Sequence, residues 1–95
     1  MDKKERLLLR SSGQKLPDLV YIGKDGLTEN VVRQIIDNLY AHELIKVKLQ
    51  NSIVDDIHSI ASKIQEECLC EVVCVIGSKI LLYKLSDKPK IKHVL

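Results

Sequence analysis

The clearest hydrophobic pattern in the chain lies between Thr28 and His42. Apolar side chains recur there every three or four residues and polar side chains fill the other positions, which is typical of an amphipathic helix. The hydroxyl of Thr28 can cap the first turn, and the helix dipole favours the acidic Glu29 beside it. The apolar face of this predicted helix comprises Val31, Val32, Ile35, Ile36 and Leu39.

A strictly alternating segment follows at residues 45–49, which read Ile-Lys-Val-Lys-Leu. This alternation predicts a half-buried strand that carries Lys46 and Lys48 on one face. The apolar positions then return to helical spacing over 53–64, which predicts a second amphipathic helix. Ser52 is placed to cap its first turn.

The remaining predicted elements are shorter. Gly13 would end a basic helix near the start of the chain, and Gly77-Ser78 is typical of a two-residue hairpin turn between two strands. The helix is predicted over 3–12 and the strands over 19–22, 69–76 and 79–85.

The element order α-β-α-β-α-β-β predicts one α/β domain, an α+β two-layer sandwich of helices packed on a four-stranded sheet. The final hairpin must be antiparallel, and the earlier crossovers suggest parallel pairing, so the sheet should be mixed. We expect the domain to span residues 1–85. Residues 86–95 read as a basic, loosely held tail, although the apolar side chains Ile91, Val94 and Leu95 could dock.

Composition fits a small globular domain, with 45% apolar and 29% charged residues in a chain of 95. No apolar run approaches the ~18 residues of a membrane helix, and the three leucines after the charged start are too few for a signal peptide. We therefore expect a cytoplasmic protein with no membrane association. All three aromatic residues are tyrosines, which disfavours recognition of bases on an extended aromatic platform.

Charge is unevenly distributed along the chain. Residues 1–17 carry a net charge of +3, residues 18–76 carry −5 and residues 77–95 carry +4, although the whole chain is only +2. The basic ends could bind nucleic acid if the fold brings them onto one face. On charge alone, solvated termini are the preferred interpretation.

Three cysteines, Cys68, Cys70 and Cys74, form the only cluster of metal-ligand type. Structural zinc usually takes four ligands with paired spacing, and no histidine lies close in sequence, so packed and reduced thiols are the preferred interpretation over a metal or redox site. All three cysteines stand at even-numbered positions, so on a strand their side chains would lie on one face. We predict no metal, no cofactor and no catalytic site, because no histidine has a cysteine, serine or carboxylate in a catalytic spacing.

The segment with the most chemical information joins the strand at 19–22 to the helix that Thr28 caps. Its loop is Gly23-Lys24-Asp25-Gly26. Glycines allow close approach of a sugar-phosphate chain, and the amides at a helix start attract anions. The same pattern also suits a simple tight turn. It is not a nucleotide-binding phosphate loop, and Asp25 would resist a small bound phosphate.

Lys46 and Lys48 form a second basic patch, which is either a binding surface or the ordinary guard of an edge strand.

Three separated blocks of the sequence resemble the CRM domain, the chloroplast RNA splicing and ribosome maturation domain, in its stand-alone bacterial YhbY-like form. These blocks are Ile22-Gly-Lys-Asp-Gly-Leu-Thr-Glu-Asn-Val, His42-Glu-Leu-Ile-Lys-Val-Lys-Leu and Val75-Ile-Gly-Ser-Lys-Ile-Leu-Leu-Tyr-Lys.

The resemblance implies the fold of the C-terminal domain of translation initiation factor 3 and RNA binding through a GxxG loop. It also implies association with large-subunit ribosomal RNA during assembly. Lys84 stands where many relatives have arginine, which keeps the charge and loses a bidentate phosphate contact. The alternative is a protein-interaction module that docks ribosomal proteins without touching RNA. In either case we expect a monomer. The residues expected to contact RNA are Gly23, Lys24, Asp25, Gly26, Thr28, Lys46, Lys48, Arg10 and Lys84.

Overall fold

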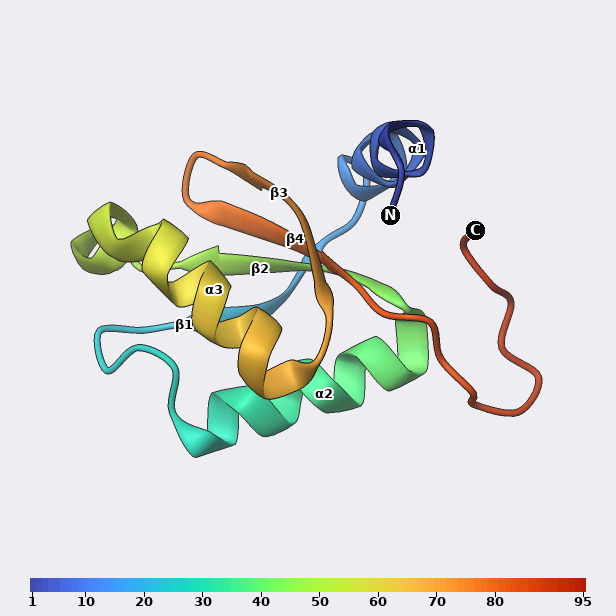
Figure 1. Ribbon diagram of the computed structural model, residues 1–95. Helices are drawn as coiled ribbons and strands as arrows, with labels where there is room; N and C mark the ends of the chain where they lie inside the picture. Colours follow the sequence, from blue (N-terminus) through green and yellow to red (C-terminus); the bar gives the residue numbers. More distant parts are fainter.

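The computed structural model describes residues 1–95 and contains three α-helices, a short 3-10 helix and one four-stranded sheet (Figure 1). The predicted element order and fold class are confirmed. The helices are α1 (Lys3–Gly13), α2 (Glu29–His42) and α3 (Ile57–Cys68), with the 3-10 helix η1 at Asn51–Asp56. The strands are β1 (Asp18–Ile22), β2 (Leu44–Leu49), β3 (Glu71–Ile76) and β4 (Lys79–Tyr83).

The sheet is mixed, as predicted, with strand order β1-β2-β4-β3. β1 and β2 are parallel, whereas β4 is antiparallel to both β2 and β3. The loop after β1, the end of β2 and the β3–β4 turn therefore lie at the same end of the sheet. Main-chain hydrogen bonds from Leu49 to Ser78 and from Gln50 to Ile22, each 2.8 Å long, hold this end together.

Helices cover both faces of the sheet (Figure 1). The larger core lies between the sheet and helices α2 and α3, and it contains alternate residues of β2 such as Ile45 and Val47. The smaller core joins α1, through Leu9, to the opposite sheet face at Leu44 and Leu81. Because α1 is short, it covers only part of that face. The uncovered part is the surface on which Lys48 lies.

The start of α3 differs from the prediction. Ser52 does not cap it, because residues 51–56 form η1, and α3 begins at Ile57 without a side-chain cap. The 3-10 turns let Ile53 and Val54 pack against the larger core. Core packing therefore displaced the helix start that the local capping signal indicated. None of the helices is both long enough and apolar enough to span a membrane.

Contacts far apart in sequence fix α1 on the sheet. Asp2 and Glu5 form a capping box at its start, and the Arg6 guanidinium donates to the carbonyl oxygens of Val72 and Val73 at 2.8 and 2.9 Å. Gly13 ends the helix, as predicted, but for a different reason. It keeps a helical conformation and packs so closely that a Cβ there would lie 2.5 Å from the methyl carbons of Leu81.

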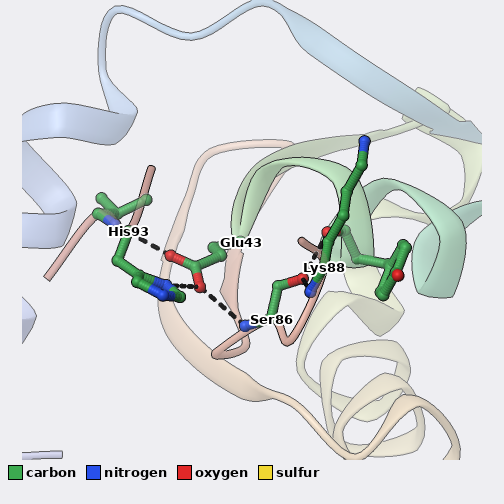
Figure 2. Close-up of polar contacts among 6 residues, drawn as sticks. Glu43, Ser86, Lys88 and His93 are labelled. Carbon is green, nitrogen blue, oxygen red and sulfur yellow. Dashed lines mark hydrogen bonds and ion pairs between the residues drawn. The ribbon is translucent and has the colours of Figure 1, made fainter. Parts of the chain in front are cut away.

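The C-terminal tail is attached to the domain, so the expectation of a loosely held tail is wrong at the residues that contact Glu43. Glu43 is fully buried, and its carboxylate accepts hydrogen bonds from the Ser86 amide at 2.8 Å and the Val94 amide at 2.9 Å. His93 Nδ1 lies 2.6 Å from the same carboxylate (Figure 2). Val94 also packs against the smaller core, as its apolar character allowed.

Candidate nucleic-acid interface

The Gly23–Gly26 loop connects the end of β1 to the start of α2 at one end of the sheet (Figure 1). The Gly26 amide donates to the Gly23 carbonyl at 2.9 Å, so Lys24 and Asp25 form the tip of a tight turn. Gly26 has φ +72°, which few other residues adopt without strain. Thr28 caps α2 as predicted, since its hydroxyl accepts from the Val31 amide at 3.2 Å.

This short segment leaves several main-chain donors unused. The amides of Lys24, Asp25, Leu27, Glu29 and Asn30 have no hydrogen-bond partner within the protein. No atom lies within 4 Å of where a Cβ on Gly26 would stand, so the loop is open to an approaching ligand. Unpaired amides at a helix start provide partial positive charge for an anion such as phosphate.

The two sides of the loop differ in charge. On the α3 side, a cleft of about 690 Å³ separates the loop from α3. Its lining includes two lysines, Lys24 and Lys63, and twice as many carboxylates. A polyanion would be repelled there. The carboxylates are Asp25, Asp56, Glu66 and Glu67.

On the sheet side, the loop borders a basic and polar surface. Lys48 lines a hollow of about 440 Å³ together with Tyr21 and Gln50. A Cβ on Gly23 would lie 3.6 Å from Gln50 Oε1 and 4.0 Å from Tyr21 Cε2, so this hollow adjoins the loop directly. We therefore consider the sheet side to be the accessible side for an anionic ligand.

A second basic group lies further along the same sheet face, at the end of α1. Arg10, Lys46 and Lys79 line a cavity of about 180 Å³ there. Lys46 Nζ donates to the Gln14 carbonyl at 3.3 Å, and Lys79 Nζ lies 3.3 Å from Asp18 Oδ2. Arg10 and Lys48 have no ion-pair partner and are the cations of this face most available to a ligand.

The fold does not bring Lys84 into this group. Lys84 follows β4 at the end of the sheet opposite the loop, because β4 runs antiparallel to β2. Its amide donates to the Glu43 carbonyl at 2.9 Å, and its side chain is exposed beside Leu69 and Leu85. The other eight predicted residues lie in the loop, at the start of α2, on β2 or in the last turn of α1.

The family model described as the CRS1/YhbY (CRM) domain matches residues 1–84. The chain belongs to the CRM domain family. The resemblance seen in the sequence is thereby confirmed.

Two bacterial relatives of this CRM domain match it over more than nine-tenths of their own length. A Bacillus subtilis protein named probable RNA-binding protein YqeI is 33% identical over 92% of this chain and 91% of its own. A Haemophilus influenzae protein named RNA-binding protein is 33% identical over 97% of this chain and 93% of its own. The solution structure of a Staphylococcus aureus protein, described as a candidate RNA-binding protein, is 37% identical. It covers 95% of this chain and 94% of its own, with a TM-score of 0.82.

Some residues of this CRM domain surface were missed from the sequence. Tyr21 and Lys79 join Lys48 on one sheet face, although they belong to three different strands. The alternation along β1 could have indicated the exposure of Tyr21, since Val20 and Ile22 on either side of it are buried. The possibility that Lys46 and Lys48 guard an edge strand is wrong, because β2 lies inside the sheet.

The cysteines do not share one face, contrary to expectation. Cys68 and Cys70 lie in the larger core, whereas Cys74 packs beside the smaller core, because the pairing of β3 with β4 is irregular between Val72 and Cys74. All three are free thiols, and burial raises the pKa of each, that of Cys70 to about 12. Protonated thiols of this kind are poor nucleophiles and metal ligands.

Proposed function

We propose that this CRM domain is a non-catalytic RNA-binding module. The sugar-phosphate backbone approaches the Gly23–Gly26 loop from the sheet side, where the loop amides and Lys48 contact phosphate groups, and Lys24 reaches the backbone from the tip of the loop. Arg10 and Lys46 extend the positive field along the sheet. Contacts of this kind position RNA without reading its sequence. The names of the relatives as RNA-binding proteins support this function.

One observation carries the proposal. The open glycine turn and the first turn of α2 together present the five unpaired main-chain amides named above, beside two exposed or partly exposed lysines, Lys24 and Lys48. Unused donors at a helix start bind a polyanion without rearrangement of the fold. The carboxylates on the α3 side direct the ligand to the opposite side of the loop.

The RNA that we propose is large-subunit ribosomal RNA, bound by a cytoplasmic monomer during subunit assembly. Crosslinking in cells, followed by sequencing of the attached RNA, tests this assignment. Large-subunit ribosomal RNA should dominate the crosslinked reads. If other RNA predominates, the proposal of RNA binding stands and the ribosomal assignment is rejected.

Three lysine variants test the interface in vitro. We expect Lys24→Ala and Lys48→Ala each to weaken RNA binding by about 3- to 10-fold, because each removes one phosphate contact of ~1 kcal/mol. Lys63→Ala is the matched control, since Lys63 is exposed on α3, across the acidic cleft from the loop. Parental binding by the Lys24 and Lys48 variants, or an equal loss in the Lys63 variant, would reject this interface.

A second candidate function is docking of a basic ribosomal protein on the acidic α3 side. Asp56, Glu66 and Glu67 line one cleft there, which favours a positively charged protein surface. Pull-down after nuclease treatment separates the two functions. Ribosomal proteins that remain bound after RNA is digested, and that Glu66→Lys releases, would favour the docking module.

A further inference from the structure

A single row of side chains crosses the uncovered part of the sheet face on which α1 lies. Tyr21 on β1 is in register with Lys48 on β2, Lys48 with Lys79 on β4, and Lys79 with Ile76 on β3. Four strands therefore place an aromatic ring, two ammonium groups and an aliphatic side chain on one line. Tyr21 and Ile76 are 55% and 45% exposed at the two ends of this row.

Tyr21 differs from the other two tyrosines in its surroundings. Tyr83 is only 8% exposed in the smaller core, and Tyr40 lies on α2, away from the sheet. The Tyr21 ring instead borders the hollow beside Lys48, with Cε2 4.0 Å from where a Cβ on Gly23 would stand. It is the aromatic ring next to the proposed backbone-binding loop.

We propose that Tyr21 stacks on an unpaired RNA base while the phosphates flanking that base contact the Gly23–Gly26 loop and Lys48. This inference rests on the proposed function and narrows its ligand to RNA with at least one unstacked nucleotide. An RNA duplex keeps its bases paired inside the helix, so it offers no free base face to a side chain. A ring beside phosphate-binding amides suits a single strand, a loop or a bulge.

The scarcity of aromatic residues is consistent with one stacked base. An extended stacking platform uses successive aromatic rings, and this sheet face exposes one beside the loop. The neighbouring cations then hold the backbone on each side of that base. This arrangement gives a preference for unpaired RNA with little preference for sequence, because every base has a face that can stack.

The test compares two labelled probes: an unstructured single-stranded oligoribonucleotide of mixed sequence and a blunt RNA duplex of the same length. Fluorescence anisotropy measures the affinity of the parent, Tyr21→Ala, Tyr21→Phe and Tyr40→Phe for each probe. The chain has no tryptophan, so quenching of intrinsic tyrosine fluorescence by the unlabelled single strand reports directly on stacking. Thermal unfolding checks that each variant is folded.

We expect Tyr21→Ala to bind the single strand about 5- to 150-fold more weakly, which corresponds to the ~1–3 kcal/mol of one stacked base. Its affinity for the duplex should be unchanged. Tyr21→Phe should retain affinity and lose the quenching, because it keeps a ring without tyrosine emission. Tyr40→Phe should retain both.

Each failure has a separate meaning. If Tyr21→Ala binds the single strand like the parent while Lys24→Ala binds it more weakly, stacking is rejected and the proposed function stands. An equal loss for single strand and duplex also rejects stacking, because it points to a contact that both forms share. If the parent binds neither probe, the proposed function is rejected together with this inference.

Discussion

The two glycines of the loop have different roles at the residue scale. Gly26 needs to be glycine for the fold, because its φ of +72° would strain another side chain. Gly23 does not have a left-handed conformation, and a Cβ there would make only ordinary contacts with Gln50 and Tyr21. A glycine that the fold does not require is more easily explained by a ligand that must approach the backbone.

Gly23→Ala should therefore separate binding from stability. We expect its free energy of unfolding in urea to stay within about 0.5 kcal/mol of the parent, since no strain is introduced. RNA affinity should fall by about 5- to 10-fold if the added methyl group displaces one phosphate contact of ~1–1.5 kcal/mol. Gly26→Ala is the comparison, and its positive φ should cost about 1–2 kcal/mol of stability. Unchanged RNA affinity in Gly23→Ala would contradict a close backbone approach.

Glu43 is the residue on which the C-terminal tail depends. It combines full burial with a φ of +65°, an uncommon conformation for a residue with a side chain. Burial alone would raise the pKa of its carboxyl group, but hydrogen bonds from Ser86, His93 and Val94 outweigh burial and lower it below the ordinary value of 4.5. The ionised carboxylate is thus the form that the folded protein stabilises.

Glu43→Gln tests this ionised contact through pH. A carboxyl group whose pKa is lowered on folding adds stability above its unfolded pKa and loses that stability as the pH falls through the folded value. At pH 7 the variant should be about 1–3 kcal/mol less stable, because an amide cannot accept from all three donors. The difference from the parent should shrink progressively below about pH 4.5. Urea unfolding at several pH values measures it, and a difference independent of pH would contradict the assignment.

At the scale of elements, the position of α1 depends on contacts with residues far away in the sequence. Its sequence contains three consecutive leucines, of which Leu7 and Leu8 are exposed and only Leu9 is buried. The helix is instead positioned by Arg6, which pairs with two β3 carbonyls at the irregular pairing with β4, and by the close contact of Gly13 with Leu81. α1 in turn places Arg10 beside Lys46 at the end of the proposed binding face.

Arg6→Ala should loosen this helix. It leaves the carbonyls of Val72 and Val73 without their side-chain donor, and we expect a loss of about 1–3 kcal/mol in the free energy of unfolding. Lys4→Ala is the matched control on the same helix, since Lys4 is exposed and makes no such contact. Hydrogen exchange should quicken in α1 before the rest of the domain. Equal stability of the two variants would show that Arg6 does not anchor the helix.

At the scale of the whole molecule, the fold separates charges that are mixed along the chain. Cations of α1, β2 and β4 gather on one sheet face, and carboxylates of the loop, η1 and α3 line the cleft on the other side of the loop. The small net charge of +2 therefore hides a strong separation of positive and negative charge on the surface. Such a distribution orients a polyanion as it approaches.

Salt dependence should report this distribution. With roughly three to five phosphates neutralised, the logarithm of RNA affinity should fall against the logarithm of salt concentration with a slope of about −2 to −4. Anisotropy titrations between low and moderate salt measure the slope. Lys48→Ala should make the slope shallower by the equivalent of about one phosphate contact, whereas Lys63→Ala should leave the slope unchanged. A flat response in the parent would count against phosphate binding.

The sequence by itself determined the features that depend on neighbouring residues. The helical period before His42, the Thr28 cap, the Gly77-Ser78 hairpin and the alternation around Lys46 and Lys48 are local signals, and each predicted element is present in the structure. The glycine loop was visible for the same reason. Three motif blocks in order also sufficed to identify the family.

Only the tertiary structure decided which residues meet across the chain. The strand order places Tyr21, Lys48 and Lys79 in one row and sends Lys84 to the opposite end of the sheet. Burial of Glu43 under the tail depends on contacts some fifty residues apart, such as the one with His93. Hydrophobic period and capping report the environment of one segment, whereas these arrangements depend on how the strands pair and on which face each helix covers.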